Sequence, residues 1–233
     1  MINPSYRLPG TPLLTIGTLV YDELGSCLVR RHNERFAGKE GIVFSETFRK
    51  DAPITGSNLP RALSLAELLS EETKGTIRLL SLADTVRYWE FLPDKDTTYA
   101  DTSSFFFDPT KTESDILFQR LCEIDCNLGV PVVASGLTVK PADNPYGFTF
   151  DTTMPHLCIM DSLAQKKDVV LCYEDGLQVG DLHGKGGDML RKGLATFGRI
   201  HRGWTMGLYA GFYHPLHADE AGRFQVLQTV SSD

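Results

Sequence analysis

The segment 112–134, with the sequence TESDILFQRLCEIDCNLGVPVVA, decides the fold class. Its aliphatic residues recur at the spacing of one helical face, at Leu117, Leu121, Ile124 and Leu128. Thr112, with Asp115 three residues later, predicts the start of this helix, and Gly129 predicts its end. Residues 130–134 are apolar and follow at once. The pattern predicts an α-to-β crossover unit over 112–134, in which a helix leads into a buried parallel strand.

Outward from this unit, the chain alternates between strand-like and helix-like patterns. A helix is predicted to begin at Ser64 and to stop at Gly75, and a third helix is predicted to begin at Asp188. Residues 84–91 fit a helix or a strand. Apolar and β-branched runs predict strands at 13–21, 26–30, 41–45, 76–82, 148–150, 157–160, 169–173, 204–213 and 224–230. The fold is therefore predicted to be α/β or α+β mixed, β-rich with about three helices. We expect a single domain over 1–233 with a β-rich N-terminal part, 1–60.

Composition narrows the classes of function. The chain has 233 residues and a formal net charge of −7, which argues against a protein that neutralises the phosphates of a nucleic acid. No apolar run approaches the roughly 18 residues of a membrane-spanning helix, and the N-terminus has no signal-peptide pattern. The five cysteines are odd in number and widely spaced, which indicates free thiols rather than a disulfide framework. We therefore expect no membrane partner, no nucleic-acid partner and a cytoplasmic location.

The C-terminal third concentrates the groups from which a site is expected. Segment 184–223 has six basic and three acidic residues, whereas segment 84–125 has four basic and ten acidic residues. Five of the six histidines follow position 150: His156, His183, His201, His214 and His217. Imidazole is the usual general base near neutral pH, and His183 and His201 are the predicted bases. The basic third is predicted to meet an anionic ligand, although two differently charged surfaces of an ordinary protein would give the same pattern.

A metal site is predicted from two short segments. His214 and His217 are three residues apart and precede Asp219, so this stretch has the ligand types of Zn²⁺ or another divalent ion. Asp181 and His183 alternate along the chain, and on an extended strand they would share one face. The predicted ligands are therefore Asp181, His183, His214 and His217, for Zn²⁺, Mn²⁺ or Mg²⁺. The alternative is a polar surface loop with scattered histidines.

The glycine-rich segment 180–188 suggests an anion site. Glycines allow backbone N–H groups to approach a ligand, and a helix beginning at Asp188 would add unpaired donors. The predicted anion-binding residues are Lys185, Gly186, Gly187 and Arg202. An ordinary glycine-rich turn is the alternative.

Residues 180–184, Gly-Asp-Leu-His-Gly, resemble the opening motif of the metallophosphoesterases. That resemblance implies that Asp181 and His183 bind metal. In that family the motif stands near the N-terminus and further metal-binding motifs follow it. Here no Gly-Asn-His-Glu segment follows in the roughly fifty remaining residues, so the resemblance is confined to these five residues.

Two further segments bear on function. Residues 133–137 end the apolar run and are a candidate ligand-facing loop or a plain strand end. Phe105, Phe106 and Phe107 are consecutive, so at least one is expected to meet a second layer or a partner subunit, which makes a homo-oligomer an expected partner. The first hypothesis is a metal-dependent hydrolase or lyase that acts on a small anionic molecule. The alternative is a non-catalytic assembly or binding protein, a subunit of a larger particle.

Overall fold

The computed structural model describes residues 2–8, 13–92, 99–107, 132–135, 137–151, 156–159, 169–183, 196–201, 216 and 218–230. The helical elements among them are α1 (Glu23–Arg35), α2 (Leu59–Thr73), α3 (Leu82–Arg87) and the 3-10 turn η1 (Trp89–Phe91). The strands up to position 151 are β1 (Ile2–Leu8), β2 (Leu13–Leu19), β3 (Ile77–Leu79), β4 (Tyr99–Phe107), β5 (Val132–Ser135), β6 (Thr138–Pro141) and β7 (Phe148–Asp151). The later strands are β8 (His156–Ile159), β9 (Val169–Glu174), β10 (Leu177–His183), β11 (Thr196–His201), β12 (Gly222–Arg223) and β13 (Gln225–Val230).

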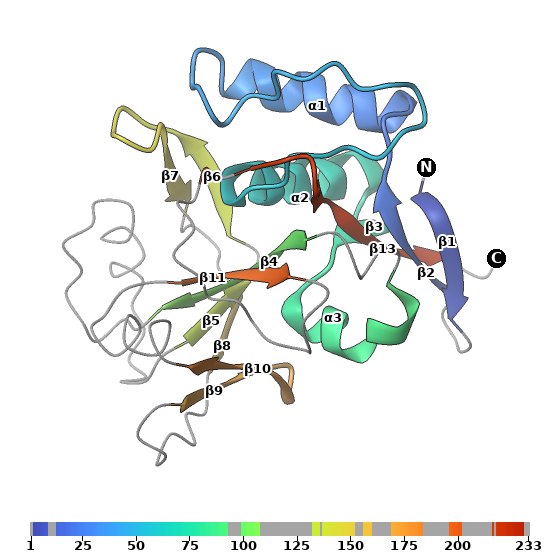
Figure 1. The fold of residues 1–233 in the computed structure, drawn as a ribbon, viewed down its shortest axis with the longest axis vertical. Coiled ribbons are helices and arrows are strands. Elements are labelled where there is room, and N and C mark those ends of the chain that lie inside the picture. The colour runs from blue at the N-terminus through green and yellow to red at the C-terminus, as the bar shows by residue number, and fades with distance from the viewer. Residues whose placement is uncertain are drawn as a thin grey trace.

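The described strands form two larger sheets and two hairpins. One sheet has the order β1-β2-β13-β3, and the other has the order β11-β4-β5-β8 with β12 paired to β4. Strands β6 and β7 form one hairpin, and β9 and β10 form the other. Figure 1 shows α1 and α2 stacked above the sheets, α3 beneath the four-stranded sheet, and the β9–β10 hairpin at the opposite end of the molecule from α1. The mixed, β-rich class predicted from the sequence is confirmed.

Helix α2 occupies the centre of this arrangement. It packs against α1, β3, β4 and β6. Asn58 caps it, since its side-chain oxygen accepts the N–H of Arg61 at 3.1 Å. The helix therefore begins at Leu59, five residues before Ser64. The predicted start at Ser64 is wrong. Pro60 is the signal for the true start, because proline is tolerated in the first helical turn. The predicted stop is confirmed, with Lys74 and Gly75 both left-handed.

The four-stranded sheet is covered on both faces. On one face, Leu19, Leu79 and Val226 belong to a buried apolar cluster with residues of α1 and α2. On the other face, Ile16 and Leu227 pack with Leu80, Leu92 and neighbouring residues. This sandwiching explains why the strand predictions at 13–21, 76–82 and 224–230 are confirmed by β2, β3 and β13.

Two strand predictions in the first fifty residues are wrong. Residues 26–30 belong to helix α1, which Asp22 caps through its side chain to the N–H of Gly25 at 3.0 Å. Aspartate is favoured both in turns and at helix N-caps, so Asp22 before this segment does not distinguish a hairpin turn from the start of a helix. Residues 41–45 form a loop, not a strand. The ambiguous stretch 84–91 falls in helix α3, with a Ser81–Asp84 capping box, followed by η1.

The strand predicted after Gly129 is confirmed by β5, but its predicted parallel pairing is not. It pairs antiparallel with β4 on one side and with β8 on the other. The predicted parallel arrangement is therefore wrong, because an apolar run reports burial on both faces and carries no information on direction. The predictions at 148–150, 157–160 and 169–173 are confirmed by β7, β8 and β9. The helices predicted over 112–129 and from Asp188, and the strand over 204–213, lie outside the described residues.

Candidate functional site at strand β4

The described structure places three of the predicted site residues at the level of the backbone. Asp181 and His183 lie two residues apart on β10, on the same face, opposite Leu171 and Val169 of β9. His201 is the last residue of β11 and lies opposite Tyr99. The other predicted site residues lie outside the described part of the chain: Lys185, Gly186, Gly187, Arg202, His214 and His217. The structure thus sets His201 in the five-stranded sheet and His183 in a separate hairpin.

Segments from the two ends of the chain meet at the start of β4. The side-chain amide of Asn58 donates to the backbone oxygen of Leu216 at 3.3 Å. The backbone N–H of Asp219 donates to the hydroxyl of Tyr99 at 3.1 Å. Thr55 also forms an isolated antiparallel bridge with Arg223. The C-terminal segment from 218 to 223 is therefore attached to the residues before α2 and to the first residue of β4.

Ser57, Tyr99 and Asp101 form a hydrogen-bonded group that we call the β4 cluster. The hydroxyl of Ser57 donates to the Oδ2 atom of Asp101 at 2.7 Å, and it accepts the N–H of Asp101 at 3.3 Å. The hydroxyl of Tyr99 donates to the backbone oxygen of Ser57 at 3.0 Å. All three residues are at most 3% exposed. A carboxylate held this deeply requires polar partners, because burying an unpaired charge is costly.

Gly222 allows this close assembly. Strand β12 runs parallel to β4, with Gly222 opposite Tyr99. A Cβ atom at position 222 would lie 2.6 Å from the backbone nitrogen of Ser57 and 2.8 Å from Cζ of Tyr99. Contacts that short require one of the neighbours to move, so only glycine fits here without displacing the β4 cluster.

Strand β11 adds an arginine and a histidine to the same region. Arg199 lies opposite Asp101, and His201 lies opposite Tyr99, in the antiparallel register of the two strands. Arg199 and His201 therefore occupy the backbone positions of β11 that face Asp101 and Tyr99 in the ladder. The register shifts between Phe197 and Arg199. Such irregularities redirect side chains and are frequent beside active sites.

The residue types at these register positions are a carboxylic acid, an imidazole and a guanidinium. An imidazole accepts or donates a proton near neutral pH, a guanidinium binds carboxylate or phosphate, and a buried carboxylate can orient either of them. Within the described residues no group of three or more His, Cys, Asp or Glu side chains is placed to hold a metal ion.

A second buried polar cluster surrounds Arg61, and its hydrogen bonds go to the backbone. The guanidinium of Arg61 donates to Ile42 at 2.8 Å, to Gly56 at 2.7 Å and to Val43 at 2.7 Å, in each case to the backbone oxygen. It also lies 4.5 Å from the ring centroid of Phe44. Burial lowers the pKa of this guanidinium. These contacts fix the loop between α1 and α2, so we assign Arg61 a structural role.

His32 belongs to this structural cluster. Its Nε2 atom lies 3.0 Å from the backbone oxygen of Ile42, and its ring packs against Phe36 and Phe44. Burial, together with the positive charges of Arg61 and Arg35, lowers the pKa of His32 to about 4, against the opposing effect of the bond to Ile42. The imidazole is therefore neutral near pH 7 and holds the loop as a hydrogen-bond donor.

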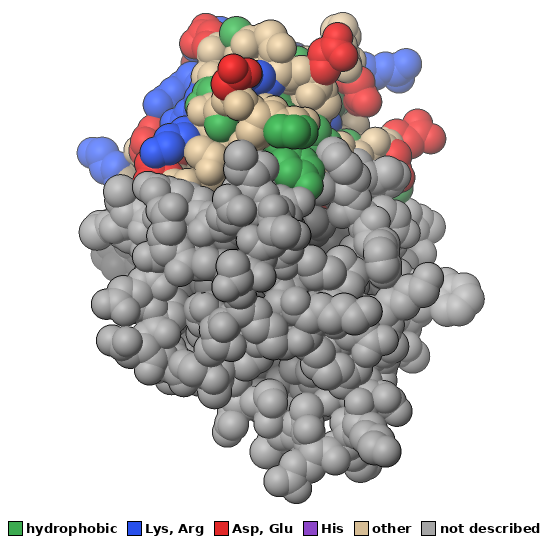
Figure 2. Space-filling model, turned by 90° about the vertical axis from the view of Figure 1, so that its left-hand side faces the viewer, with side chains coloured by type: hydrophobic (Ala, Val, Ile, Leu, Met, Phe, Trp, Pro, Cys, Tyr) green, Lys and Arg blue, Asp and Glu red, His purple; other side chains and the backbone are tan. Residues whose placement is uncertain are grey.

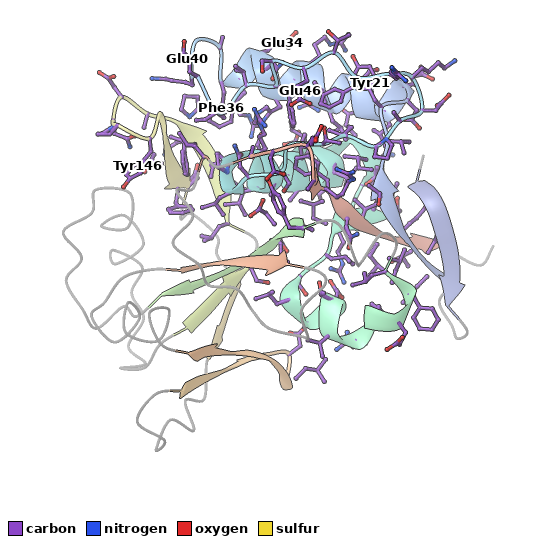
Figure 3. The ribbon with its side chains drawn as sticks, in the orientation of Figure 1. Tyr21, Glu34, Phe36, Glu40, Glu46 and Tyr146 are labelled. Carbon is purple, nitrogen blue, oxygen red and sulfur yellow. The ribbon has the colours of Figure 1, made fainter. Side chains whose placement is uncertain are left out.

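The surface of the α1 layer carries mixed charge. Figure 2 shows Lys and Arg side chains interspersed with Asp and Glu over the described part of one face. Glu34, Glu40 and Glu46 lie along α1 and its following loop, away from β4, and Tyr146 lies at the tip of the β6–β7 hairpin (Figure 3). Arg31 pairs there with Glu71 and Glu72. This layer therefore presents no charged patch of one sign on the face shown.

Of the residues in this candidate site, only His201 was predicted from the sequence. Ser57, Tyr99, Asp101 and Arg199 belong to no motif, and they are up to 142 positions apart in the printed sequence. A weak signal was available in Gly222, because an isolated glycine beside a strand often marks close backbone approach. No family model, curated protein or solved structure matches this chain. Among the described residues, no helix is both long and apolar enough to cross a bilayer.

Proposed function

We propose that this protein is a hydrolase or lyase that acts on a small anionic molecule at the β4 cluster. The observation that supports this most strongly is the register of β4 and β11, with Arg199 opposite Asp101 and His201 opposite Tyr99. The mildly basic segment 184–223 favours an anion.

In this proposal each residue has a distinct role. His201 moves a proton at the reacting bond, and Arg199 binds the anionic group of the substrate through its two-pronged guanidinium. Asp101 orients the cation beside it, and Ser57 holds the carboxylate of Asp101 in place by the 2.7 Å hydrogen bond. Tyr99 ties the C-terminal segment to this site through Asp219.

A divalent ion, Zn²⁺, Mn²⁺ or Mg²⁺, is the second part of the proposal. Its ligands would be Asp181, His183, His214 and His217, since imidazole and carboxylate are the donor types that such ions accept. The shared face of Asp181 and His183 on β10 is compatible with a pair of ligands. The ion would activate a water molecule, which is the nucleophile of a hydrolase.

Turnover of p-nitrophenyl phosphate and of small carboxylate-bearing esters tests the first part. We expect His201→Gln to lower kcat by about 10²- to 10⁴-fold, the range for loss of a general acid or base. We expect Arg199→Lys to raise KM, because lysine cannot form the bidentate contact. Lys140→Ala, on the exposed end of β6, is the matched control and should keep full activity. Turnover that is unchanged in both site variants, or no turnover of any anionic substrate, would refute the proposal.

Metal analysis tests the second part separately. The freshly purified protein should contain bound metal, and chelation should lower both activity and Tm, because an ion bound to the folded state stabilises it. Asp181→Asn combined with His183→Gln should lower the metal content. If the protein purifies without metal, and added Zn²⁺ or Mn²⁺ raises neither its activity nor its Tm, the metal part of the proposal is refuted. The role of the β4 cluster is then tested by the turnover assay alone.

The alternative function, a subunit of a larger assembly, rests on strand β1. In the order β1-β2-β13-β3, strand β1 lies at the edge and pairs only with β2 among the described strands. An edge strand presents unpaired N–H and C=O groups that a second chain can extend. Phe105, Phe106 and Phe107 lie in β4, between β11 and β5, so they are not part of such an edge. Light scattering at micromolar concentration tests self-assembly, and a strict monomer would contradict it.

A further inference from the structure

We infer that residues 218–223 form a strap that opens to admit a ligand to the β4 cluster and then closes over it. The inference rests on the function proposed above, because it concerns access to the same site. Ser57, Tyr99 and Asp101 are at most 3% exposed. A ligand therefore reaches them only when an element that covers them moves. The contacts of the strap with its neighbours identify it as that element.

The strap lies directly against the β4 cluster. Gly222 of the strap is opposite Tyr99 in the parallel pairing of β12 with β4. A Cβ atom at position 222 would be 2.6 Å from the backbone nitrogen of Ser57 and 2.8 Å from the hydroxyl oxygen of Tyr99. Contacts this short mean that the backbone of the strap itself covers these two residues.

The other described elements around the cluster are held more firmly than the strap. Helix α2 contributes Leu65 and Leu68 to the buried apolar cluster, and β5 and β11 both pair with β4 over several residues. The strap pairs with β4 at two positions only, and its Asp219 and Glu220 are exposed. Neither of the two described apolar clusters contains a residue of the strap. Segments with few buried apolar contacts are those that open locally.

The strap keeps its own shape through internal hydrogen bonds. The side chain of Asp219 accepts the N–H of Ala221 at 2.8 Å, and the backbone oxygen of Asp219 accepts the N–H of Gly222 at 3.1 Å. The guanidinium of Arg223 donates to the backbone oxygens of Glu220 and Gly222. These bonds connect the strap to itself, so opening leaves them intact and the strap moves as a unit.

The bonds that opening breaks are those to β4. The N–H of Asp219 donates to the hydroxyl of Tyr99 at 3.1 Å, and the N–H of Tyr99 donates to the backbone oxygen of Ala221 at 3.3 Å. Part of this loss is offset at Arg223. Its Nε atom is buried and has no hydrogen-bond partner among the described residues, and an unpaired buried donor is costly. Opening exposes this nitrogen to water, which brings the open state closer in free energy to the closed one.

The strap is anchored beyond both of its ends. On the C-terminal side, Phe224 is fully buried in the apolar core, and its backbone oxygen accepts the N–H of Leu19 at 2.8 Å. On the N-terminal side, the backbone oxygen of Leu216 accepts the side-chain amide of Asn58 at 3.3 Å. Fixed points on either side allow the strap to swing away from Tyr99 and to return to the same place.

A reversible disulfide across the strap tests the inference. Thr55 and Arg223 form an isolated antiparallel bridge, which places their Cα atoms about 4.5–5.5 Å apart, within the range of a disulfide. Oxidation of the double variant Thr55→Cys, Arg223→Cys should lock the strap. The amide of Tyr99, which donates to Ala221, should then exchange its hydrogen at least about tenfold more slowly by NMR. Turnover of anionic substrates should fall by a similar factor, and reduction should restore both.

The matched control is a disulfide in a hairpin far from the strap in sequence. Lys140 and Thr149 are directly opposite in the antiparallel β6–β7 pair. The double variant Lys140→Cys, Thr149→Cys should show the same Tyr99 exchange and the same turnover in its oxidised and reduced forms. Comparing oxidised with reduced protein in each variant separates the lock from the effect of the substitutions and of the reductant.

Tyr99→Phe gives a second measurement that needs no disulfide. It removes the hydroxyl that accepts the N–H of Asp219 and keeps the aromatic ring. The amide of Asp219 should exchange about fivefold faster, the equivalent of one lost hydrogen bond. Tyr146→Phe, at the tip of the β6–β7 hairpin, should exchange like the wild type at Asp219.

Two results overturn the inference: Tyr99 exchange that is equal in the oxidised and reduced strap variant, or a locked strap that leaves turnover unchanged. A wild type that turns over no anionic substrate refutes the proposed function, and with it the role of the strap in admitting a ligand. The exchange measurements then still decide whether the strap opens, so the two failures are distinguishable.

Discussion

The two buried polar clusters of this protein use their hydrogen bonds in different ways. Around Arg61 and His32, side-chain donors serve backbone oxygens of a loop that is close in sequence, between Ile42 and Gly56. In the β4 cluster, a side chain bonds to another side chain across 44 positions, from Ser57 to Asp101. The first pattern holds one loop in shape. The second assembles functional groups from distant segments, which is what a binding or catalytic site requires.

The largest expected effect comes from Arg61→Ala, which removes three hydrogen bonds to buried backbone oxygens. The oxygens of Gly56 and Val43 would lose a charged donor, and the oxygen of Ile42 would keep only its contact with His32 among the bonds described. We expect the free energy of unfolding to fall by about 3–5 kcal/mol, the upper range for a single substitution. Urea unfolding followed by circular dichroism measures it.

The control for Arg61 is Arg49→Ala, an exposed arginine of the same loop, which should change stability by no more than about 0.5 kcal/mol. Arg61→Lys should be nearly as harmful as the alanine variant, because an ammonium group cannot reach three oxygens in one plane. Equal stability of the Arg61→Ala and Arg49→Ala variants would show that the loop is not held by this cluster.

A somewhat smaller effect is expected from pH, through His32. Its pKa is about 4 in the folded chain and about 6.5 in the unfolded chain, so below pH 6.5 only the unfolded chain gains a proton there. Its contribution is therefore present above pH 6.5 and is lost as the pH falls from 6.5 to 4. The loss amounts to about 3 kcal/mol. The measurement is the loss of unfolding free energy between pH 7 and pH 4. The amount by which this loss is larger in the wild type than in His32→Gln is the contribution of His32.

The control for the pH experiment is Asp84→Asn. Burial acts to raise the pKa of Asp84, but the hydrogen bonds from Arg78 and Ser81 and the charge of Arg78 together outweigh it and lower that pKa. Its contribution is therefore lost at a more acidic pH, below its ordinary value of 3.8. His32→Gln should flatten the stability profile between pH 6.5 and 4, and Asp84→Asn should leave that interval unchanged. An unaltered profile in His32→Gln would contradict the role of the buried imidazole.

The same contrast explains how far the sequence could predict the structure. Strands β2 and β13 were predictable because buried apolar residues such as Ile16, Leu19 and Val226 give each segment the apolar, β-branched composition of a strand. Helix α1 was not, because Asp22 favours a turn and a helix cap alike. Within the candidate site, His201 was accessible to sequence reasoning through its residue type alone. Ser57, Asp101 and Arg199 were not, because their significance comes from strand pairings between residues about 98 positions apart, such as Asp101 with Arg199.

The smallest expected effect compares one substitution at two glycines. At Gly222, alanine would push against the backbone of Ser57 and the ring of Tyr99, and we expect a loss of about 2 kcal/mol together with lower turnover. At Gly38, alanine meets no atom within 4 Å, and only its positive φ of 77° opposes the change, at a cost of about 1 kcal/mol. The measurements are urea unfolding and the turnover assay. The two expected losses of stability differ by only about 1 kcal/mol, so the turnover measurement distinguishes the two variants. If Gly38→Ala lowers turnover as much as Gly222→Ala does, activity follows overall stability. That result would contradict a direct role of the β4 cluster in turnover.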